Sequence, residues 1–581
     1  MSKKRIIIAV LSTLLLILAG AALWFQLSIP PGEEWIAYEN EALVASIDRQ
    51  LEGMNMERLA ADYADLVPGR DVLALQQAVK RVALSYEDLT AICLYRIKTL
   101  DQGYHGYNSV IEVAPDAILQ ARARDRERLE RLERGEALPP LFGIPVMLKD
   151  NINTAGIPTS AGAVAFSGYI PAEDAGLVRM LKAQGAVILG KNNLSEFAYY
   201  VSSVMPSGYS GRKGQTVNPF GPLKISPSGS SSGSAVAVAA GLVPISIGTE
   251  TAGSIAGPAS AGSVVGFKPT RGRISAEGIF PLIRAVDTPG PITGTVQDAA
   301  LAYGCLSGEP AVRKLDRSAL NGAKIGLVSY DYNDKAMVET LKVNLEAAGA
   351  QVIFVPLSQE DVQIQNIISL TFKQDFEDFA TEYGLPITKL EDLIHYNTED
   401  SKRRIKYGQD HLIAANAVHT PDPTQIQASI QNARNLLEAA LSEHGLDAIA
   451  FLNTSASTVV SAAGFPQLTV PLGTDEKGVP QGATFTAGYG ADWELLNLGY
   501  AFEQNAGGRI EPEAGAHRGR IAPRLSVRIS TSIAVIDPGF CSLAHLIAPR
   551  DPVYSFFHPE RRAGLLKPEG DIKLHTLPSR V

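Results

Sequence analysis

The sequence predicts an α/β fold arranged as a single large domain. Apolar runs typical of buried strands alternate with helical stretches, and no long linker or fixed repeat divides residues 30–515. Hydrophobic residues make up 45% and charged residues 19% of the 581 positions, which supplies a sizeable core and excludes global disorder. We therefore expect one α/β domain over residues 29–515. The predicted buried strands are 186–189, 243–247, 325–328, 352–355 and 448–452.

Two segments are predicted to be helical. Residues 116–134 are rich in arginine and glutamate and are followed by Gly135, which indicates a solvated surface helix with a glycine stop. The span from about residue 359 to 443 also has a mainly helical pattern.

Charge and cysteine content exclude several classes of protein. The chain has 52 basic and 61 acidic residues, a net charge of −9, which argues against a general nucleic-acid binder. Its three cysteines, Cys93, Cys305 and Cys541, lie too far apart in sequence for a disulfide framework or a CxxC metal site. Since no H-E-x-x-H motif or His/Cys cluster occurs either, we expect no metal and no cofactor.

The N-terminus has the pattern of an export signal. Basic residues at positions 3–5 precede an uncharged apolar run over residues 6–25. A small-residue cleavage option lies at 19–21, whereas Trp24 prolongs the apolar run as in an uncleaved membrane anchor. Residues 1–28 are therefore expected to be a signal peptide or an N-terminal anchor. The protein would then be exported, periplasmic or extracellular, with membrane contact through residues 6–25 if the signal is uncleaved.

The C-terminus differs in composition from the rest of the chain. From His517 onward there are ten Lys/Arg and five Asp/Glu, a net charge of +5. Scattered prolines and the lack of a sustained period indicate that residues 516–581 form a basic, poorly ordered tail outside the main fold.

Lys149 is the first candidate for a chemical role. It ends the apolar run of the segment G-I-P-V-M-L-K-D-N, residues 143–151, so its ammonium is expected to be partly desolvated. Desolvation lowers the pKa of a lysine, as a lysine base requires. A Lys-Asp pair that closes a strand is more often a surface ion pair, and the motif alone does not decide between the two.

A Gly/Ser-rich segment at residues 228–234 is the second candidate. Its composition is that of a flexible linker, but it runs directly into small apolar residues at 235–240, which favours a buried helix behind a loop of hydroxyls. The segment also satisfies G-x-S-x-G with Ser231 central. However, the prolines in 218–227 oppose the strand that an α/β-hydrolase elbow needs.

The third candidate is G-T-E-T-A-G-S-I, residues 248–255, which directly follows the predicted strand 243–247. A glycine beside a serine on a tight turn lets several backbone N–H groups point to one place, as in an oxyanion hole. An ordinary turn is the alternative. No Lys-Ser/Thr follows the glycines as in a P-loop. No histidine occurs between His105 and His395, so Lys149 is the obvious base if the three clusters form one site.

Together, in this order, the three clusters resemble the amidase signature family. The resemblance implies a Ser–cis-Ser–Lys triad in which Lys149 is the base, Ser230 the bridging serine in a cis peptide and Ser254 the nucleophile. It also implies a central mixed β-sheet flanked by helices on both faces. The oxyanion hole would be formed by the backbone N–H groups of Thr251, Ala252 and Gly253, together with that of Ser254. The resemblance covers about residues 85–512, with supporting motifs at 190–197, 266–272, 287–292, 463–466 and 470–473.

The Gly/Ser loop and the Thr249-Glu250-Thr251 sequence look like the bacterial peptide amidase branch, whose members remove a C-terminal amide. We therefore expect a peptide or small-molecule amide substrate, an acyl-serine intermediate, and no nucleic-acid partner. Small aliphatic or aryl amides, fatty amides and ω-amino-acid oligomers remain alternatives. Alternatives of a different class are a non-catalytic amidase-like binding protein and an amidotransferase subunit.

This sequence departs from the family pattern in three places. Ala252 stands where a second glycine is common, and Ala256 where an arginine is common. Asn453 follows a strand where Pro-Thr is expected.

Overall fold

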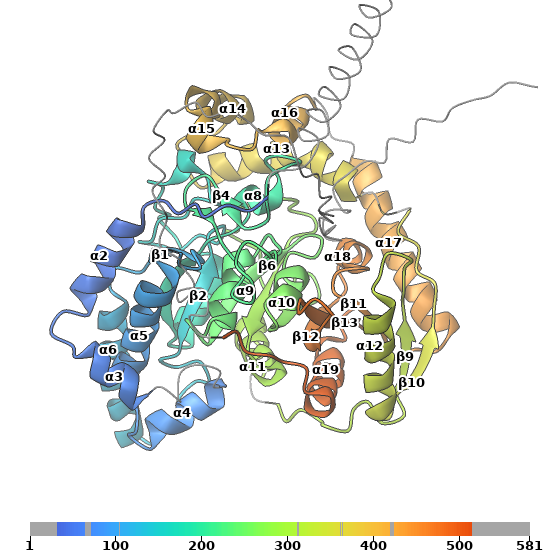
Figure 1. The fold of residues 1–581 in the computed structure, drawn as a ribbon, viewed down its shortest axis with the longest axis horizontal. Coiled ribbons are helices and arrows are strands. Elements are labelled where there is room, and N and C mark those ends of the chain that lie inside the picture. Colours follow the sequence, from blue (N-terminus) through green and yellow to red (C-terminus); the bar gives the residue numbers. More distant parts are fainter. Residues whose placement is uncertain are drawn as a thin grey trace, which may run out of the picture. The chain divides into compact units, whose positions relative to one another are not determined.

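A mixed sheet of eleven strands forms the centre of the fold (Figure 1). The computed structural model describes residues 32–63, 71–103, 105–310, 313–360, 362, 364–418 and 423–513. The spatial order of the strands is β1-β3-β2-β6-β8-β7-β12-β13-β11-β9-β10. Their bounds are β1 Val110–Val113, β2 Pro145–Lys149, β3 Val187–Asn192, β6 Ile245–Glu250, β7 Val265–Lys268, β8 Thr288–Thr293, β9 Lys324–Leu327, β10 Gln351–Phe354, β11 Ala448–Leu452, β12 Gln467–Thr474 and β13 Pro480–Thr486. A separate two-stranded ribbon joins β4 (Tyr209–Ser210) to β5 (Gly214–Gln215).

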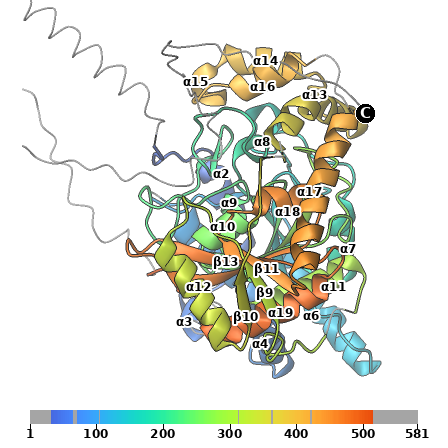
Figure 2. The same cartoon turned by 90° about the vertical axis from the view of Figure 1, so that its right-hand side faces the viewer.

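Helices flank this sheet, as Figures 1 and 2 show. The predicted α/β class is therefore confirmed. The N-terminal helices are α2 Asn40–Gln50, α3 Met56–Asp62, α4 Val72–Lys80, α5 Tyr86–Arg96 and α6 Ala117–Glu133. The central ones are α7 Gly176–Ala183, α8 Glu196–Tyr199, α9 Ser232–Ala239, α10 Ala256–Ala261, α11 Val296–Ser307 and α12 Lys335–Ala347. The later ones are α13 Ile364–Glu382, α14 Leu390–Glu399, α15 Ser401–Arg404, α16 Asp410–Asn416, α17 Pro423–Glu443, α18 Ser457–Ala463 and α19 Asp492–Ala506. Two short helical turns lie at Ile97–Asp101 and Val164–Phe166.

The parallel pairing of β2 with β3 and β6 determines where the site lies. Val146 pairs with Ile245, and Lys149 pairs with Asn192. Because parallel strands carry their carboxyl ends to one edge of a sheet, Lys149 and the end of β6 lie at the same edge. The rest of the sheet is mixed, since β8 and β7 run antiparallel and β9 and β10 are again parallel to each other.

Two hydrophobic clusters stabilise the fold. The larger one packs the sheet against the helices around it. The second lies under α13, α14, α16 and α17, and includes five phenylalanines joined by a chain of ring contacts. These are Phe166, Phe197, Phe280, Phe372 and Phe376. The predicted helical span 359–443 thus forms a helical layer with its own apolar core.

The surface helix over 116–134 is confirmed as α6, and Gly135 after it has φ 70°. One strand prediction was wrong in its burial. Residues 352–355 were expected to be buried, but β10 is the outermost strand of the sheet, with Ile353 38% and Phe354 56% exposed. Its apolar composition resembles that of a central strand, yet it pairs with β9 alone.

All the described residues belong to one compact unit. The predicted signal or anchor at residues 1–28 and the predicted tail at 516–581 both lie outside the described residues. Among the described helices, none is long and apolar enough to cross a membrane.

Candidate active site

Lys149 lies at the end of β2 and is completely buried. Its Nζ lies 2.8 Å from Ser230 Oγ, 2.9 Å from Thr249 Oγ1 and 3.2 Å from the Thr249 carbonyl oxygen. Burial lowers the pKa of Lys149 to about 7, although the negative charges of Asp287 and Glu250 oppose the shift. The surface ion pair considered for this lysine is therefore not what the structure shows, since a substantial fraction of the amine is uncharged at neutral pH.

Three other lysines are also buried, and their ammonium groups donate to threonine, amide or backbone oxygens that hold the fold together. Lys191 donates to Thr154 and Thr159, Lys213 to Asn40 and Gln102, and Lys268 to the carbonyls of Pro269 and Phe465. Burial alone therefore does not single out a base. Of these four lysines, Lys149 is the one whose Nζ contacts a serine hydroxyl.

Ser230 is held by the loop that precedes α9. The Gly229–Ser230 peptide bond is cis. The carbonyl oxygen of Ser230 accepts the Ser195 N–H at 3.1 Å, and the next residue, Ser231, binds both backbone groups of Thr249 through its hydroxyl. Gly233 allows this packing, because a Cβ there would lie 2.3 Å from the Asn193 carbonyl oxygen. The small residues of the loop thus bring β3, β6 and α9 into close contact.

The loop between β6 and α10 presents free backbone donors. Within the described chain, the N–H groups of Thr251, Ala252, Gly253 and Ser254 donate to no protein acceptor. Gly253 has φ 100°, a conformation that favours glycine. A loop of unsatisfied N–H groups beside a serine is suited to bind an oxyanion.

Glu250 determines the shape of this loop. Its buried carboxylate accepts the N–H groups of Ile255 and Ala256 at 2.7 and 2.9 Å. It also accepts the Ser461 hydroxyl at 2.9 Å and the Gln467 amide at 2.8 Å. The carboxylate therefore closes the turn on one side and joins it to α18 and β12 on the other.

Ser254 is half-buried on the same loop, two residues before α10. Its carbonyl oxygen accepts the Ser231 N–H at 3.1 Å, which places it beside the cis-peptide loop. The structure thus brings the sequence-predicted residues Lys149, Ser230 and Ser254 together with the loop 251–253.

Two polar residues of the site were missed as functional candidates. Thr249 offers both its hydroxyl and its carbonyl to Lys149, and Asn151 donates to the same hydroxyl at 3.1 Å. Both residues lie inside the motifs that carry the resemblance, Asn151 in the segment of Lys149 and Thr249 in the segment of Ser254, so membership of these motifs was the available signal.

Asp287 begins the supporting motif 287–292, for which the sequence alone predicts no role. Its buried carboxylate accepts the Thr251 hydroxyl at 2.5 Å and the N–H groups of Leu282 and Ile283 at 2.7 and 3.0 Å. Burial raises the pKa of Asp287 to about 7, against the effect of these hydrogen bonds. Asp287 therefore fixes Thr251, the first residue of the loop 251–254 whose N–H groups are suited to bind an oxyanion and which we call the oxyanion loop.

Two of the three departures from the family pattern, Ala252 and Asn453, have local explanations. Ala252 packs against the phenylalanine-containing cluster. Asn453, at φ 52°, exchanges hydrogen bonds with β13 through its side chain. The methyl group of Thr454 packs against the positions of Gly253 and Gly257, where a Cβ would lie 3.2 and 3.3 Å from it.

The chain belongs to the amidase signature family. A family profile described as Amidase matches residues 88–451. A probable amidase of Arabidopsis thaliana is 35% identical over 459 residues, 74% of this chain and 88% of the relative. Indoleacetamide hydrolase of Pseudomonas savastanoi is 31% identical over 440 residues, covering 67% and 93% of the two chains. One component of a glutamyl-tRNA(Gln) amidotransferase from Synechococcus is 29% identical over 475 residues, 74% of this chain and 96% of that component.

Solved structures show the same fold. An amidase family protein from Bacillus anthracis superposes with a TM-score of 0.80 at 39% identity, covering 83% of this chain and 100% of its own. The peptide amidase of Stenotrophomonas maltophilia superposes with a TM-score of 0.70 at 37% identity, covering 78% and 99%. The protein is therefore an amidase-family hydrolase of amide C–N bonds.

Proposed function

We propose that the protein hydrolyses a C-terminal peptide amide, or another small carboxamide, through an acyl intermediate on Ser254. The observation that carries this proposal is the 2.8 Å contact between the buried Nζ of Lys149 and Ser230 Oγ. An uncharged amine at that position can accept a proton from the hydroxyl, and the lowered pKa of about 7 leaves the amine partly uncharged at neutral pH.

In the first half-reaction, Lys149 accepts the Ser230 proton while Ser230 accepts the Ser254 proton. Ser254 Oγ forms a bond to the amide carbon. The loop N–H groups hold the negative oxygen, each donor contributing on the order of 3 kcal/mol to the transition state. The proton then returns through Ser230 to the leaving nitrogen, the C–N bond breaks, and ammonia or an amine departs.

In the second half-reaction, water attacks the Ser254 ester by the same route in reverse. The water proton passes through Ser230 toward Lys149, and a new C–O bond forms. The ester bond to Ser254 Oγ breaks, and the oxygen recovers a proton. The products are a carboxylic acid and the free enzyme, so no cofactor is consumed.

Two observations support a peptide amide as the substrate. The solved peptide amidase is 37% identical over most of both chains, and the Gly/Ser loop and Thr249-Glu250-Thr251 resemble that branch. The relative that hydrolyses indoleacetamide favours a small aryl amide as the alternative.

The test is ammonia release by the full-length protein from an amidated tripeptide, indole-3-acetamide and a long-chain fatty amide. We expect the tripeptide amide to be the best substrate. Ser254→Ala should abolish release, whereas Ser442→Ala, at an exposed position on α17, should not change it. Release from indole-3-acetamide alone would overturn the peptide assignment and leave the amidase chemistry standing. Ammonia release by Ser254→Ala equal to that of the parent would refute the assignment of Ser254 as the nucleophile.

We also propose that residues 1–28 direct export, because a basic start followed by the apolar run 6–25 has the pattern of a signal or anchor. Fractionation of a Gram-negative host that expresses the full chain should place the protein outside the cytoplasm. A chain without residues 1–28 should stay inside. The full chain in the cytoplasm would contradict this proposal.

A further inference from the structure

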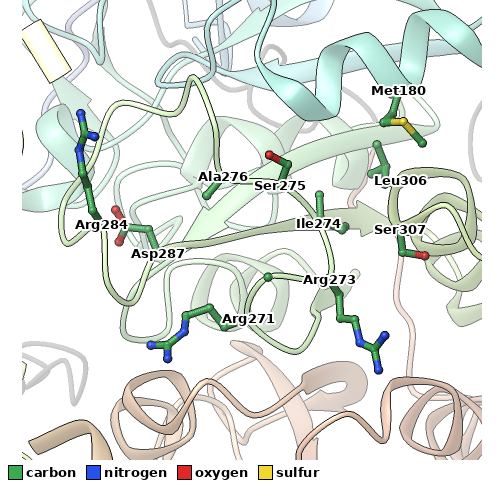
Figure 3. A pocket seen from close by; sticks show the side chains of 11 residues that line it. Met180, Arg271, Arg273, Ile274, Ser275, Ala276, Arg284, Asp287, Leu306 and Ser307 are labelled. Atoms are coloured by element: carbon green, nitrogen blue, oxygen red, sulfur yellow. The ribbon is translucent and has the colours of Figure 1, made fainter. Parts of the chain in front are cut away.

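A cavity of about 580 Å³ lies beside the turn that follows β7 (Figure 3). Arg271, Arg273, Arg284 and Asp287 line it together with Met180 and Leu306, and we call it the arginine pocket. Lys149, Ser230 and Ser254 do not line it. Asp287 is the one residue that it shares with the surroundings of the oxyanion loop. The pocket is thus a separate cavity next to the candidate active site.

The acidic residue in its wall is already engaged. Asp287 accepts three hydrogen bonds, from Thr251, Leu282 and Ile283, and contributes no ion pair to an arginine within the described chain. Two of the arginines are compensated from outside the pocket. Arg273 lies 3.7 Å from Glu309 and 3.9 Å from Asp492, and Arg284 lies 3.0 Å from Glu382.

Arg271 has no such compensation. In the part of the chain that the structure describes, it forms no ion pair, and its half-buried guanidinium donates to the Ala285 carbonyl. A second arginine, which does not line the pocket, binds the same end of α18: the Arg271 N–H donates to the Gly464 carbonyl and the Arg434 side chain to the adjacent Ala463 carbonyl. Arg434 donates to the Ala463 carbonyl at 3.0 Å and lies over the Tyr489 ring at 5.0 Å, and it too forms no ion pair with a described residue. Burial and the positive charge of Arg434 lower the pKa of Arg271.

The end of α18 explains part of this arrangement. Cations are favoured near the carbonyls at a helix C-terminus, where Ala463 lies. One cation would satisfy that preference, whereas two adjacent arginines without an acid repel each other. A bound anion would remove the repulsion, and a guanidinium with free N–H groups matches a carboxylate or phosphate.

The opposite end of the pocket holds two large apolar side chains beside Ser307. Figure 3 shows Met180 and Leu306 at one end, away from Arg271 and Arg284 at the other. A ligand that fills this cavity would therefore have an anionic head and an apolar body.

We propose that the arginine pocket binds a small organic carboxylate with an apolar body, the chemical class that amide hydrolysis releases. The link to a reaction product rests on the proposed function, whereas the preference for an anion does not. The amide substrate is uncharged, whereas the carboxylate that hydrolysis releases is negatively charged. The pocket would therefore distinguish product from substrate by charge. Arg271 also contacts Ala285 in the loop that Asp287 closes, so the ligand would bind against the support of Thr251.

Calorimetric titration with hexanoate and hexanamide tests the proposal, since these probes share a body and differ in charge. The titrations use the full-length protein with Ser254→Ala, so neither turnover nor the peptide substrate enters the result. Hexanoate should bind at least tenfold more tightly than hexanamide. Arg271→Gln should weaken hexanoate at least tenfold, and Arg134→Gln, at an exposed arginine that follows α6 and does not line the pocket, should leave it unchanged.

A second variant at the same position separates a loss of binding from a loss of the fold. Arg271→Lys keeps the charge and loses the planar fork, so it should bind hexanoate more weakly than the parent and more tightly than Arg271→Gln. Equal affinity for the two probes, or hexanoate affinity unaffected by Arg271→Gln, would overturn the proposal. Displacement of hexanoate by equimolar inorganic phosphate would overturn the carboxylate assignment in favour of a phosphoryl ligand.

Discussion

Replacing Lys149 with methionine should remove activity and stabilise the fold at neutral pH. Burial lowers the pKa of Lys149 from 10.5 to about 7. In the unfolded chain the amine keeps its proton up to about pH 10.5, whereas in the folded protein it loses it near pH 7. Between these values the unfolded state holds more protons, so the free energy of unfolding rises with pH. The lysine therefore destabilises the folded state most at and below neutral pH.

The magnitude follows from the shift. At pH 7 the shifted pKa of Lys149 lowers the free energy of unfolding by about 4 kcal/mol, and at pH 9.5 by about 1 kcal/mol. Methionine, of similar length, abolishes this penalty but leaves the Ser230 and Thr249 hydroxyls without the amine, at a cost of about 1 kcal/mol each. Lys149→Met should thus be more stable than the parent by about 2 kcal/mol at pH 7, and less stable than the parent by about 1 kcal/mol at pH 9.5.

The assay is urea unfolding of the parent and Lys149→Met at both pH values, with ammonia release measured in parallel. Lys477→Met, at an exposed lysine, is the matched control and should move neither the stability nor the rate. A gain that is the same at both pH values would refute the argument, because it would not come from the lysine charge. Undiminished ammonia release from Lys149→Met would refute the role as base.

Three further predictions concern the same site. The value of kcat/KM should rise with pH through about 7 as Lys149 loses its proton, and a rate independent of pH from 5.5 to 8.5 would contradict this. Asp287→Asn removes a charge that raises the pKa of Lys149, so the acidic limb of that pH profile should move to lower pH; a shift to higher pH would disprove the electrostatic link. Gly233→Ala should destabilise the protein by more than about 2 kcal/mol in urea unfolding, because the new Cβ would lie 2.3 Å from the Asn193 carbonyl oxygen, and wild-type stability would show that the loop yields freely.

The sequence predicted the parts of this fold that local pattern determines. The apolar run ending at Lys149 predicted a desolvated lysine, and the small residues after the Gly/Ser loop predicted the buried helix α9. Both predictions succeed because they depend only on local sequence: a lysine at the end of an apolar strand is buried with that strand, and small side chains allow a helix to pack closely.

Other features depend on packing between distant segments. The partnership of Thr249 with Lys149 depends on the pairing of β2 with β6, and the exposure of β10 depends on its place at the sheet edge. Arg271 and Arg434 lie far apart in sequence and both bind carbonyls at the end of α18, so no local sequence pattern predicts their proximity.

The four hydrogen bonds that Glu250 accepts determine how short an active chain can be. Two of its partners, Ser461 and Gln467, lie beyond residue 451, the last position that the family profile matches. A chain cut after residue 451 would keep every residue of the proposed triad and its loop, yet it would leave a buried carboxylate without half of its donors. Such a fragment should lose the turn that aims the loop N–H groups, so the minimal active chain must extend at least through β12.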